Sequence, residues 1–282
     1  MSEEFEKTQM IEIREPEKKP GKKKKLSKAG VILFSLLLIA SVCGAGYSGY
    51  LFISTMLERK QGTGSYDDLS DKTVNVTQAP ESEKTKIDID FKSLAEINPD
   101  VVGWLMQDTS VINYPIVQNP DNEYYLNHLF TGEWNHMGCV FTHSDSDPDF
   151  MDYNTPLFAH GRKDGTMFGS LESYKSQEYY EQHKTFLLVT RKGKVYLLEA
   201  FAGSVNDATV PFLMTSFESD EQYISYVQHW FDVSDFRAEV WVYPGDRIVT
   251  MLTCTDDFQD ARYALFCKMT DVTDQYEITA AD

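Results

Sequence analysis

The chain has 282 residues and a formal net charge of -18, and its length suggests one large domain or one domain with appendages. The charge is uneven: residues 1–28 carry nine basic and six acidic residues, whereas the remainder carries 17 basic and 38 acidic residues. Because binding to nucleic acid needs a basic face, the acidic remainder argues against a nucleic-acid partner and against flat binding to anionic lipid.

The N-terminal region predicts a membrane anchor. Residues 1–28 have the composition of a disordered basic tail and contain four consecutive lysines, Lys22 to Lys25. Residues 29–53 contain no charged residue, and a helix of that length, at ~1.5 Å per residue, crosses a hydrocarbon core of about 30 Å. We therefore expect a transmembrane helix over residues 29–57, with the N-terminus cytoplasmic and the remainder extracellular by the positive-inside rule. A cleaved signal peptide is the alternative, but its apolar core is usually shorter and ends at a small-residue cleavage site.

The rest of the chain predicts a linker and one globular domain. Residues 58–85 are polar and contain Gly62, Gly64 and Pro80, which indicates a flexible linker. Residues 86–282 are expected to form the domain. Short apolar runs separated by turn residues predict strands near residues 101–105, 111–117, 138–142, 155–160, 186–190, 195–202, 248–254 and 263–269. Helical spacing predicts helices near residues 91–97, 167–174, 176–183 and 219–230. The prediction is therefore a mostly β domain, a barrel or a sandwich, with short helices on its outside.

The segment from Ile248 to Met269 contains a candidate catalytic pair. Cys254 ends the first of its two predicted strands, and Arg262 opens the second. Strand ends are rigid, so both side chains can be held at one point. A thiolate is a nucleophile, and a guanidinium can hold a carbonyl oxygen or stabilise an oxyanion. From these residues alone, a buried structural cysteine beside a surface arginine remains the alternative.

A cysteine nucleophile also needs a general acid or base, and His160 is the strongest candidate among six histidines. It ends an apolar strand and precedes a polar, glycine-containing turn, residues 161–165. A residue at the end of a strand, next to such a turn, has an exposed side chain on a backbone that the strand holds in position.

A rival cluster consists of His136, Cys139 and His143, whose spacing could supply three zinc ligands. It also has a weak resemblance to the His-Gly-Cys signature of L,D-transpeptidases, but Met137 interrupts the signature and Phe141 stands where that family has arginine. An ordinary strand with a buried Cys139 is the alternative to both.

Several motifs together resemble those of the class B sortases. The family's Thr-Leu-x-Thr-Cys motif is matched by Thr250-Met-Leu-Thr-Cys254, and its arginine by Arg262 after a short loop that ends in Asp-Ala-Arg. The histidine motif is matched by Phe-Ala-His-Gly-Arg-Lys-Asp-Gly-Thr-Met-Phe over residues 158–168, which differs from the family pattern on both sides of His160. The segments at 98–104, 112–118 and 219–230 are also similar, so the resemblance covers about residues 88 to 270.

The resemblance implies a closed sortase-type β-barrel with three catalytic residues. Cys254 would attack the threonine carbonyl of a sorting signal near the C-terminus of a secreted protein and form a thioacyl-enzyme. His160 would protonate the leaving amine, and Arg262 would hold the oxyanion. The acceptor amine would belong to peptidoglycan or its lipid-linked precursor, and no metal or organic cofactor would be required.

Other interpretations stay open at this point. A sortase that polymerises pilins would use a lysine amine as acceptor, and a catalytically silent, membrane-tethered binding module would keep the fold without turnover. Asp256 could orient His160 or only shape the loop. Cys139 and Cys267 are expected to affect stability alone.

Overall fold

The computed structural model describes residues 27–77, 84–207, 214–254 and 260–278, with Cys254 described by its backbone only. The chain forms two structural units, Met1–Ile53 and Ser54–Asp282. Helix α1 (Lys28–Thr73) begins in the first unit and ends in the second. Its first part is apolar with exposed side chains, and it is long and apolar enough to cross a membrane; a signal sequence near an N-terminus meets the same criterion.

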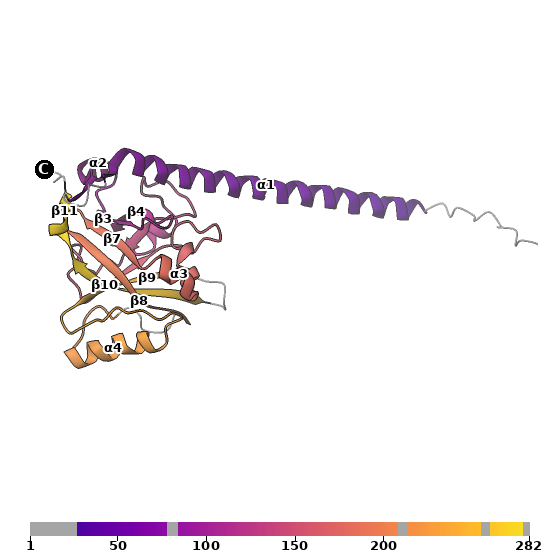
Figure 1. The fold of residues 1–282 in the computed structure, drawn as a ribbon. Helices are drawn as coiled ribbons and strands as arrows, with labels where there is room; N and C mark the ends of the chain where they lie inside the picture. Colours follow the sequence, from indigo (N-terminus) through magenta and orange to yellow (C-terminus); the bar gives the residue numbers. More distant parts are fainter. Residues whose placement is uncertain (1–26, 78–83, 208–213, 255–259, 279–282) are drawn as a thin grey trace, which may run out of the picture. The chain divides into compact units, whose positions relative to one another are not determined.

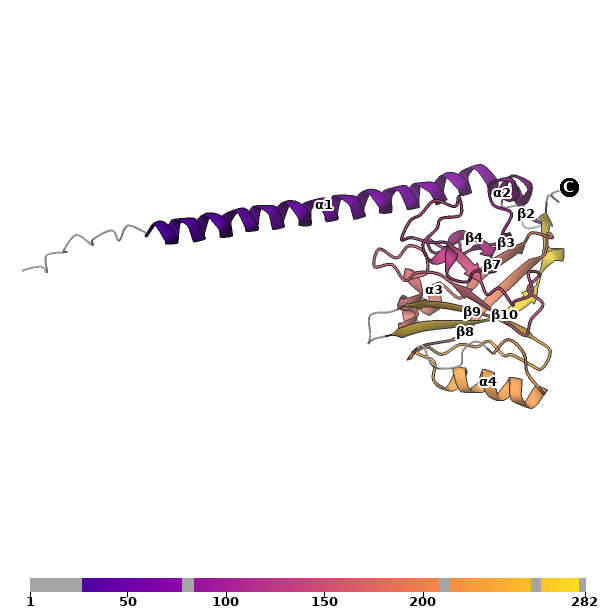
Figure 2. The ribbon, with the colours of Figure 1, turned by 180° about the vertical axis from the view of Figure 1, so that it is seen from behind.

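The second unit is built around a closed barrel of eight strands within the described residues, in the order β10-β8-β7-β3-β4-β5-β6-β9 (Figures 1 and 2). The strands are β3 (Val101–Met106), β4 (Asn113–Gln118), β5 (Val140–Thr142), β6 (Asn154–Phe158), β7 (Thr185–Thr190), β8 (Val195–Asp207), β9 (Arg247–Cys254) and β10 (Ala261–Asp271). The pairs β4–β5 and β6–β9 are parallel, and the other pairs are antiparallel. The predicted mostly β domain is confirmed, as a barrel.

A small second sheet has the order β1-β2-β11. It joins β1 (Val74–Thr77) and β2 (Thr85–Ile89), which follow α1, to β11 (Tyr276–Ile278) near the end of the described chain. Because β11 pairs in parallel with β2, the last described strand is tied to the segment that enters the barrel.

Short helices connect the strands. They are α2 (Phe91–Ile97), η1 (Tyr124–Leu126), η2 (Gly169–Lys175), α3 (Gln177–Gln182), α4 (Asp220–Asp232) and η3 (Thr273–Gln275). The helices predicted near residues 91–97, 176–183 and 219–230 are confirmed. The helix predicted over residues 167–174 is a 3₁₀ helix that begins at Gly169.

Helix α4 begins at the predicted cap and packs through the predicted face. The hydroxyl of Ser219 accepts a hydrogen bond from the backbone N–H of Gln222, as expected of an N-cap residue. The side-chain oxygen of Gln222 reaches back to the N–H of Glu218 at 2.6 Å. Four residues at helical spacing, Tyr223, Tyr226, Val227 and Trp230, are buried, and α4 lies outside the barrel beside β8 (Figures 1 and 2).

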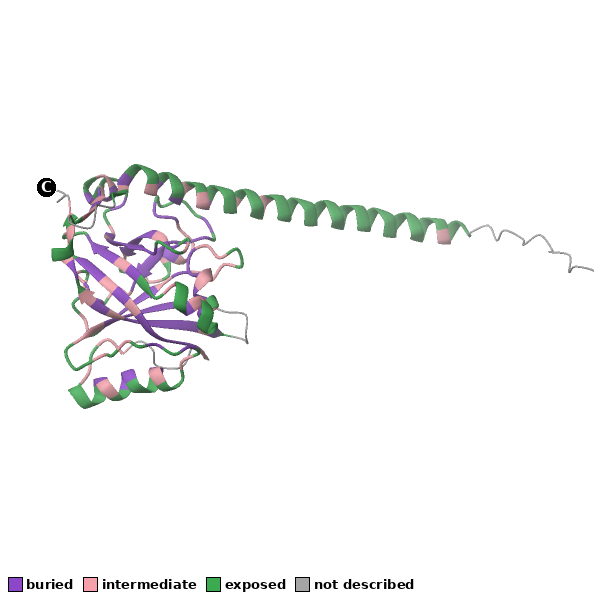
Figure 3. Ribbon diagram, viewed as in Figure 1, coloured by how far each residue is buried: buried purple, intermediate pink, exposed green. Residues whose placement is uncertain are grey.

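The flexible linker expected over residues 58–85 is wrong for residues 58–73, which continue α1. This part of the helix packs on the barrel unit through Gly62, Tyr66, Leu69 and Thr73, spaced three or four residues apart (Figure 3). The contact uses a glycine, a tyrosine and a threonine, so it leaves no regular apolar pattern in the sequence. The globular unit therefore begins at Ser54 and not near residue 86.

Candidate active site

The pairing of three strands brings the three predicted catalytic positions to one end of the barrel. Phe158 of β6 is paired in parallel with Leu252 of β9, and His160 and Cys254 each lie two residues beyond that pair. Cys254 is in turn paired with Arg262 of β10. Directly opposite residues in an antiparallel pair have Cα atoms about 4.5–5.5 Å apart. The register alone therefore gathers the ends of β6, β9 and β10 around these positions.

Buried polar contacts fix this register. The N–H of Ala159 donates to the carbonyl of Leu252 at 3.3 Å, which extends the pairing one residue past β6. The hydroxyl of Thr250 donates to Oδ1 of Asn154 at 2.7 Å, and Nδ2 of Asn154 donates to the hydroxyl of Tyr226 in α4 at 3.2 Å. Asn154 and Thr250 are fully buried. The first threonine of the cysteine motif thus ties β9 to β6 and, through Asn154, to α4.

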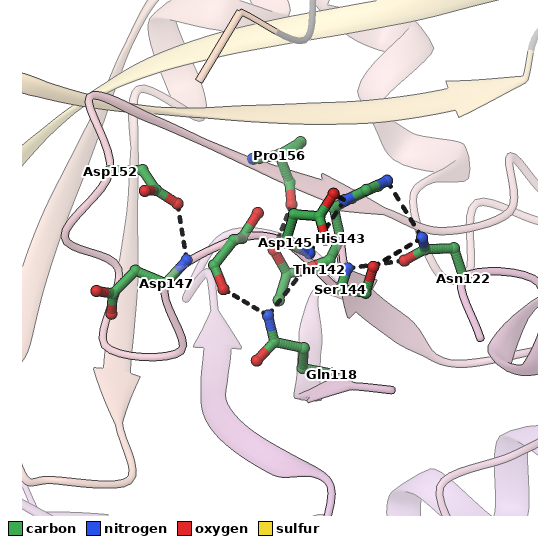
Figure 4. A network of polar contacts seen from close by, with 10 residues as sticks. Gln118, Asn122, Thr142, His143, Ser144, Asp145, Asp147, Asp152 and Pro156 are labelled. Atoms are coloured by element: carbon green, nitrogen blue, oxygen red, sulfur yellow. Dashed lines mark hydrogen bonds and ion pairs between the residues drawn. The ribbon is translucent and has the colours of Figure 1, made fainter. Parts of the chain in front are cut away.

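A second polar network holds the chain between β5 and β6 (Figure 4). The side-chain amide of Gln118 in β4 donates to the carbonyls of His143 and Ser146 at 2.8 and 2.7 Å. The hydroxyl of Thr142 donates to the carbonyl of Pro156 at 2.9 Å. These bonds attach β4 to the loop that leads into β6, and β5 to β6 itself, the strand that precedes His160.

The imidazole of His160 is half-buried and has a defined partner. Its Nε2 atom lies 2.7 Å from the carbonyl oxygen of Leu126, the last residue of η1. A carbonyl can only accept, so we assign the proton in this bond to Nε2. Within the described residues Nδ1 has no hydrogen-bond partner. In this tautomer the unprotonated ring nitrogen is Nδ1.

The turn after His160 is closed by backbone contacts. The N–H of Phe168 donates to the carbonyl of His160 at 3.1 Å, and Gly161 forms a β-bridge with Met167. Met167 has φ of 53°, and its N–H donates to the hydroxyl of Tyr114 at 3.1 Å. Residues 161–168 therefore form a closed turn that is hydrogen-bonded back to His160.

Gly169 is a structural requirement that the sequence reading missed. A Cβ atom at this position would lie 2.0 Å from the carbonyl oxygen of Arg162. Only glycine lets the two segments approach so closely. In the sequence, this requirement is indicated by the glycine that directly follows Met167 and Phe168 at the end of the histidine motif.

Arg262 is held between two strands. It is paired with Cys254 on one side and with Asn206 of β8 on the other. Its side chain is half-buried, and Nη1 donates to the carbonyl of Ala261 at 3.0 Å. Among the described residues no carboxylate forms an ion pair with it. Asp256, whose role the sequence left open, lies outside the described residues.

The rival cluster is not assembled. Cys139 is buried, its thiol lies 3.8 Å from the carbonyl of Pro115, and burial raises its pKa to about 12. The imidazole of His143 contacts Asn122 and Asp145 instead (Figure 4). In the described part of the chain no three His, Cys, Asp or Glu residues are placed to bind a metal ion. The alternative of a buried Cys139 is confirmed.

Cys267 is also buried, and burial holds the pKa of its thiol well above the usual range.

The chain has clear relatives in sequence, although no family model matches it. It is 32% identical over 212 residues to sortase B of Staphylococcus aureus, covering 75% of this chain and 85% of that protein. It is 31% identical over 182 residues to sortase B of Listeria monocytogenes, covering 64% of this chain and 74% of that protein.

Solved structures agree with this relationship. A Staphylococcus aureus sortase B–substrate complex matches with a TM-score of 0.66 and 29% identity, over 77% of this chain and 99% of that one. A sortase B-like protein of Bacillus anthracis matches with a TM-score of 0.65 and 30% identity, over 75% of this chain and 97% of that one. The closed barrel and these relatives show that the chain belongs to the class B sortases and is a sortase-type cysteine transpeptidase.

Proposed function

We propose that Cys254, His160 and Arg262 cleave a C-terminal sorting signal after threonine and join the protein to a peptidoglycan amine. The observation that supports this proposal is the strand register. It places Cys254 opposite Arg262 and sets His160 level with Cys254 along the parallel pair β6–β9.

In the first half-reaction the thiolate of Cys254 attacks the carbonyl carbon of the signal's threonine. A tetrahedral intermediate forms, and N–H groups of Arg262 stabilise its oxyanion. The C–N bond then breaks, and protonated His160 gives its Nδ1 proton to the leaving amine. The C-terminal fragment departs, and the threonine acyl group stays on Cys254 as a thioester.

In the second half-reaction an amine attacks the thioester carbon. Neutral His160 takes a proton from this amine at Nδ1. The C–S bond breaks, and the thiolate of Cys254 is regenerated. The new amide joins the secreted protein to the acceptor, which we propose is peptidoglycan or its lipid-linked precursor.

The anchor explains how enzyme and substrates meet. We propose that residues 29–57 span the membrane with the N-terminus cytoplasmic, because four lysines precede the apolar part of α1. The catalytic unit is then extracellular. Secreted proteins that are still held at the same membrane meet it at a raised effective concentration.

Peptide cleavage by the full chain in detergent micelles tests the proposal. Quenched fluorescent peptides of the Asn-Pro-x-Thr-x and Ser/Pro-Pro-x-Thr-Gly kinds are incubated with wild type, Cys254→Ala, His160→Ala and the control His229→Ala, whose imidazole is exposed on α4. Cleavage after threonine by wild type and His229→Ala alone supports the proposal. Cleavage by Cys254→Ala would overturn it.

The acceptor is tested by adding amines to the same reaction. A transfer product with a peptidoglycan-type peptide amine supports wall anchoring. Transfer to the lysine of a pilin-type peptide alone would favour the pilin-polymerising alternative. A folded protein that cleaves no peptide and whose Cys254 does not react with a methanethiosulfonate would favour a silent binding module.

A further inference from the structure

The second part of α1 lies against both loops that hold His160. The first loop, residues 119–139, includes η1 and presents the carbonyl of Leu126 to Nε2. The second loop, residues 161–168, follows His160 and returns to it through the N–H of Phe168. The orientation of the imidazole therefore depends on where these two loops lie.

Helix α1 contacts the first loop at several points. Glu58 accepts two hydrogen bonds: its carboxylate from the N–H of His136 at 2.7 Å, and its carbonyl from Nδ2 of Asn135 at 3.0 Å. Two turns further along, the hydroxyl of Tyr66 donates to the carbonyl of Gly138 at 2.6 Å. Gly62 lies between these contacts and faces Met137.

Within the first loop, the residues that contact α1 are packed against Tyr125 and Leu126. Gly138 has φ of 65°, and a Cβ there would lie 2.6 and 2.9 Å from the carbonyl oxygens of Tyr125 and Leu126. The N–H of Cys139 donates to the carbonyl of Tyr125 at 2.9 Å. A shift of residues 135–138 therefore moves η1, and with it the partner of His160.

Helix α1 also contacts the second loop. Nε of Arg59 lies 3.1 Å from a carboxylate oxygen of Asp164. The same carboxylate accepts from the N–H of Thr166 at 3.1 Å and lies 3.8 Å from Nε of Arg162. Asp164 thus links α1 to the turn that closes on His160.

We propose that residues 58–66 of α1, directly after the apolar segment, are a positioning element for His160. They fix the two loops so that the Leu126 carbonyl holds the Nε2 proton and Nδ1 stays available for proton transfer. The inference rests on the proposed role of His160. A displacement of about 1 Å by a change remote from the chemistry can lower a rate by about 10²-fold, so this helix influences turnover without touching substrate.

Two glycines on the same helix provide a matched test in the full chain in detergent. A Cβ at Gly62 would lie 2.9 Å from the sulfur of Met137 and 3.3 Å from Oδ1 of Asn135, whereas a Cβ at Gly64 has no neighbour within 4 Å. Gly62→Leu is expected to lower kcat/KM by about 10- to 100-fold and to shift its pH profile, while Gly64→Leu stays within about twofold of wild type. Both substitutions raise helix propensity equally, so the difference reports contact with the loop.

The ion pair gives a second, milder test. Arg59→Ala should lower kcat/KM, and Arg59→Lys, which keeps a positive charge beside Asp164 and leaves the other contacts of Asp164 intact, should retain part of the activity that the alanine variant loses. Because half of the Arg59 side chain is exposed, the effect of the alanine variant is expected to be only about 2- to 5-fold and to weaken at high salt. Lys60→Ala, exposed one residue further on, is the control. If circular dichroism shows that Gly62→Leu does not fold, the Arg59 variants test the proposed positioning role of α1 in its place.

A readout independent of turnover separates failure of this inference from failure of the proposed function. The ¹⁵N chemical shifts of the His160 imidazole, assigned with His160→Gln, should show the Nε2–H tautomer in wild type and Gly64→Leu. They should show a mixture of tautomers in Gly62→Leu. Identical tautomers and identical pH profiles in all three folded proteins would overturn the inference, even if wild type cleaves peptides and Cys254→Ala does not.

Discussion

Cys254 and Arg262 are directly paired across the antiparallel strands β9 and β10. On its other side Arg262 is paired with Asn206 of β8, so two strands fix its backbone. A slip of one residue in either pairing would move Arg262 to the other face of the sheet. The backbone of Arg262 is thus positioned by the strand pairing of the barrel itself.

Replacing Arg262 tests whether its guanidinium stabilises an oxyanion. Arg262→Ala should lower kcat/KM by at least ~10²-fold, which is the usual effect of losing an oxyanion donor. Arg262→Lys should recover only part of the activity, because an ammonium lacks the planar pair of donors. Peptide cleavage rates provide the measurement, with thermal unfolding as the control for folding. An Arg262→Ala protein with wild-type kcat/KM would remove Arg262 from the site.

Thr250 is part of the cysteine motif, but its contacts are structural. Thr250→Val should lower the free energy of unfolding by about 1–3 kcal/mol, because a buried hydrogen bond from the Thr250 hydroxyl to Oδ1 of Asn154 is lost. The kcat of the folded enzyme should stay close to that of wild type. Denaturant unfolding measures the first effect and peptide cleavage the second. Thr185→Val, at an exposed position of β7, is the control. A loss of kcat without a loss of stability would show that Thr250 acts in the chemistry.

The N-cap of α4 provides a test of how the helix on the outside of β8 is held. Ser219→Ala should destabilise the protein by about 1 kcal/mol, since the N–H of Gln222 loses its acceptor. Ser216→Ala, exposed and outside the helix, should have little effect. Both values come from denaturant unfolding. Equal stabilities for the two variants would mean that the cap contributes nothing.

Burial of Cys139 predicts a loss of stability at alkaline pH. Burial raises the pKa of its thiol to about 12, whereas an unfolded cysteine titrates near 8.5. Between these values the folded state binds the proton more tightly, so the free energy of unfolding falls as pH rises above about 8.5, by up to ~1.4 kcal/mol per pH unit for this group. Unfolding of wild type and Cys139→Ala at pH 8 and pH 10 measures the difference. Wild type should lose more stability than the variant over this interval, and an equal loss would contradict the assignment.

Most of the barrel could be predicted from the sequence, because its strands and helices follow simple patterns. The run Ile248–Cys254 and the stripe from Tyr223 to Trp230 show the apolar spacing of a buried strand and of a packed helix, and both are confirmed. The positions of Cys254 and Arg262 relative to each other also follow from two strands joined by a short loop.

Other features could not be predicted, for physical reasons. The contact of α1 at Gly62 and Tyr66 depends on a glycine and a single hydroxyl, so residues 58–73 looked like a linker. The partner of His160 is a backbone carbonyl, that of Leu126, which any residue could supply. The pairing of β11 with β2 joins segments far apart in the chain, and no local pattern reports such a contact.

The central claim is that Cys254 carries the substrate as a thioester, and intact-protein mass spectrometry tests it most directly. Wild-type chain is mixed with a cleavable peptide in the absence of any added amine, quenched in acid and weighed, with Cys254→Ala treated in parallel. The account predicts an added mass equal to the peptide up to its threonine acyl group, located on Cys254 by digestion and absent from the variant. Peptide cleavage without any adduct in wild type at early times, or the same adduct on Cys254→Ala, would contradict it.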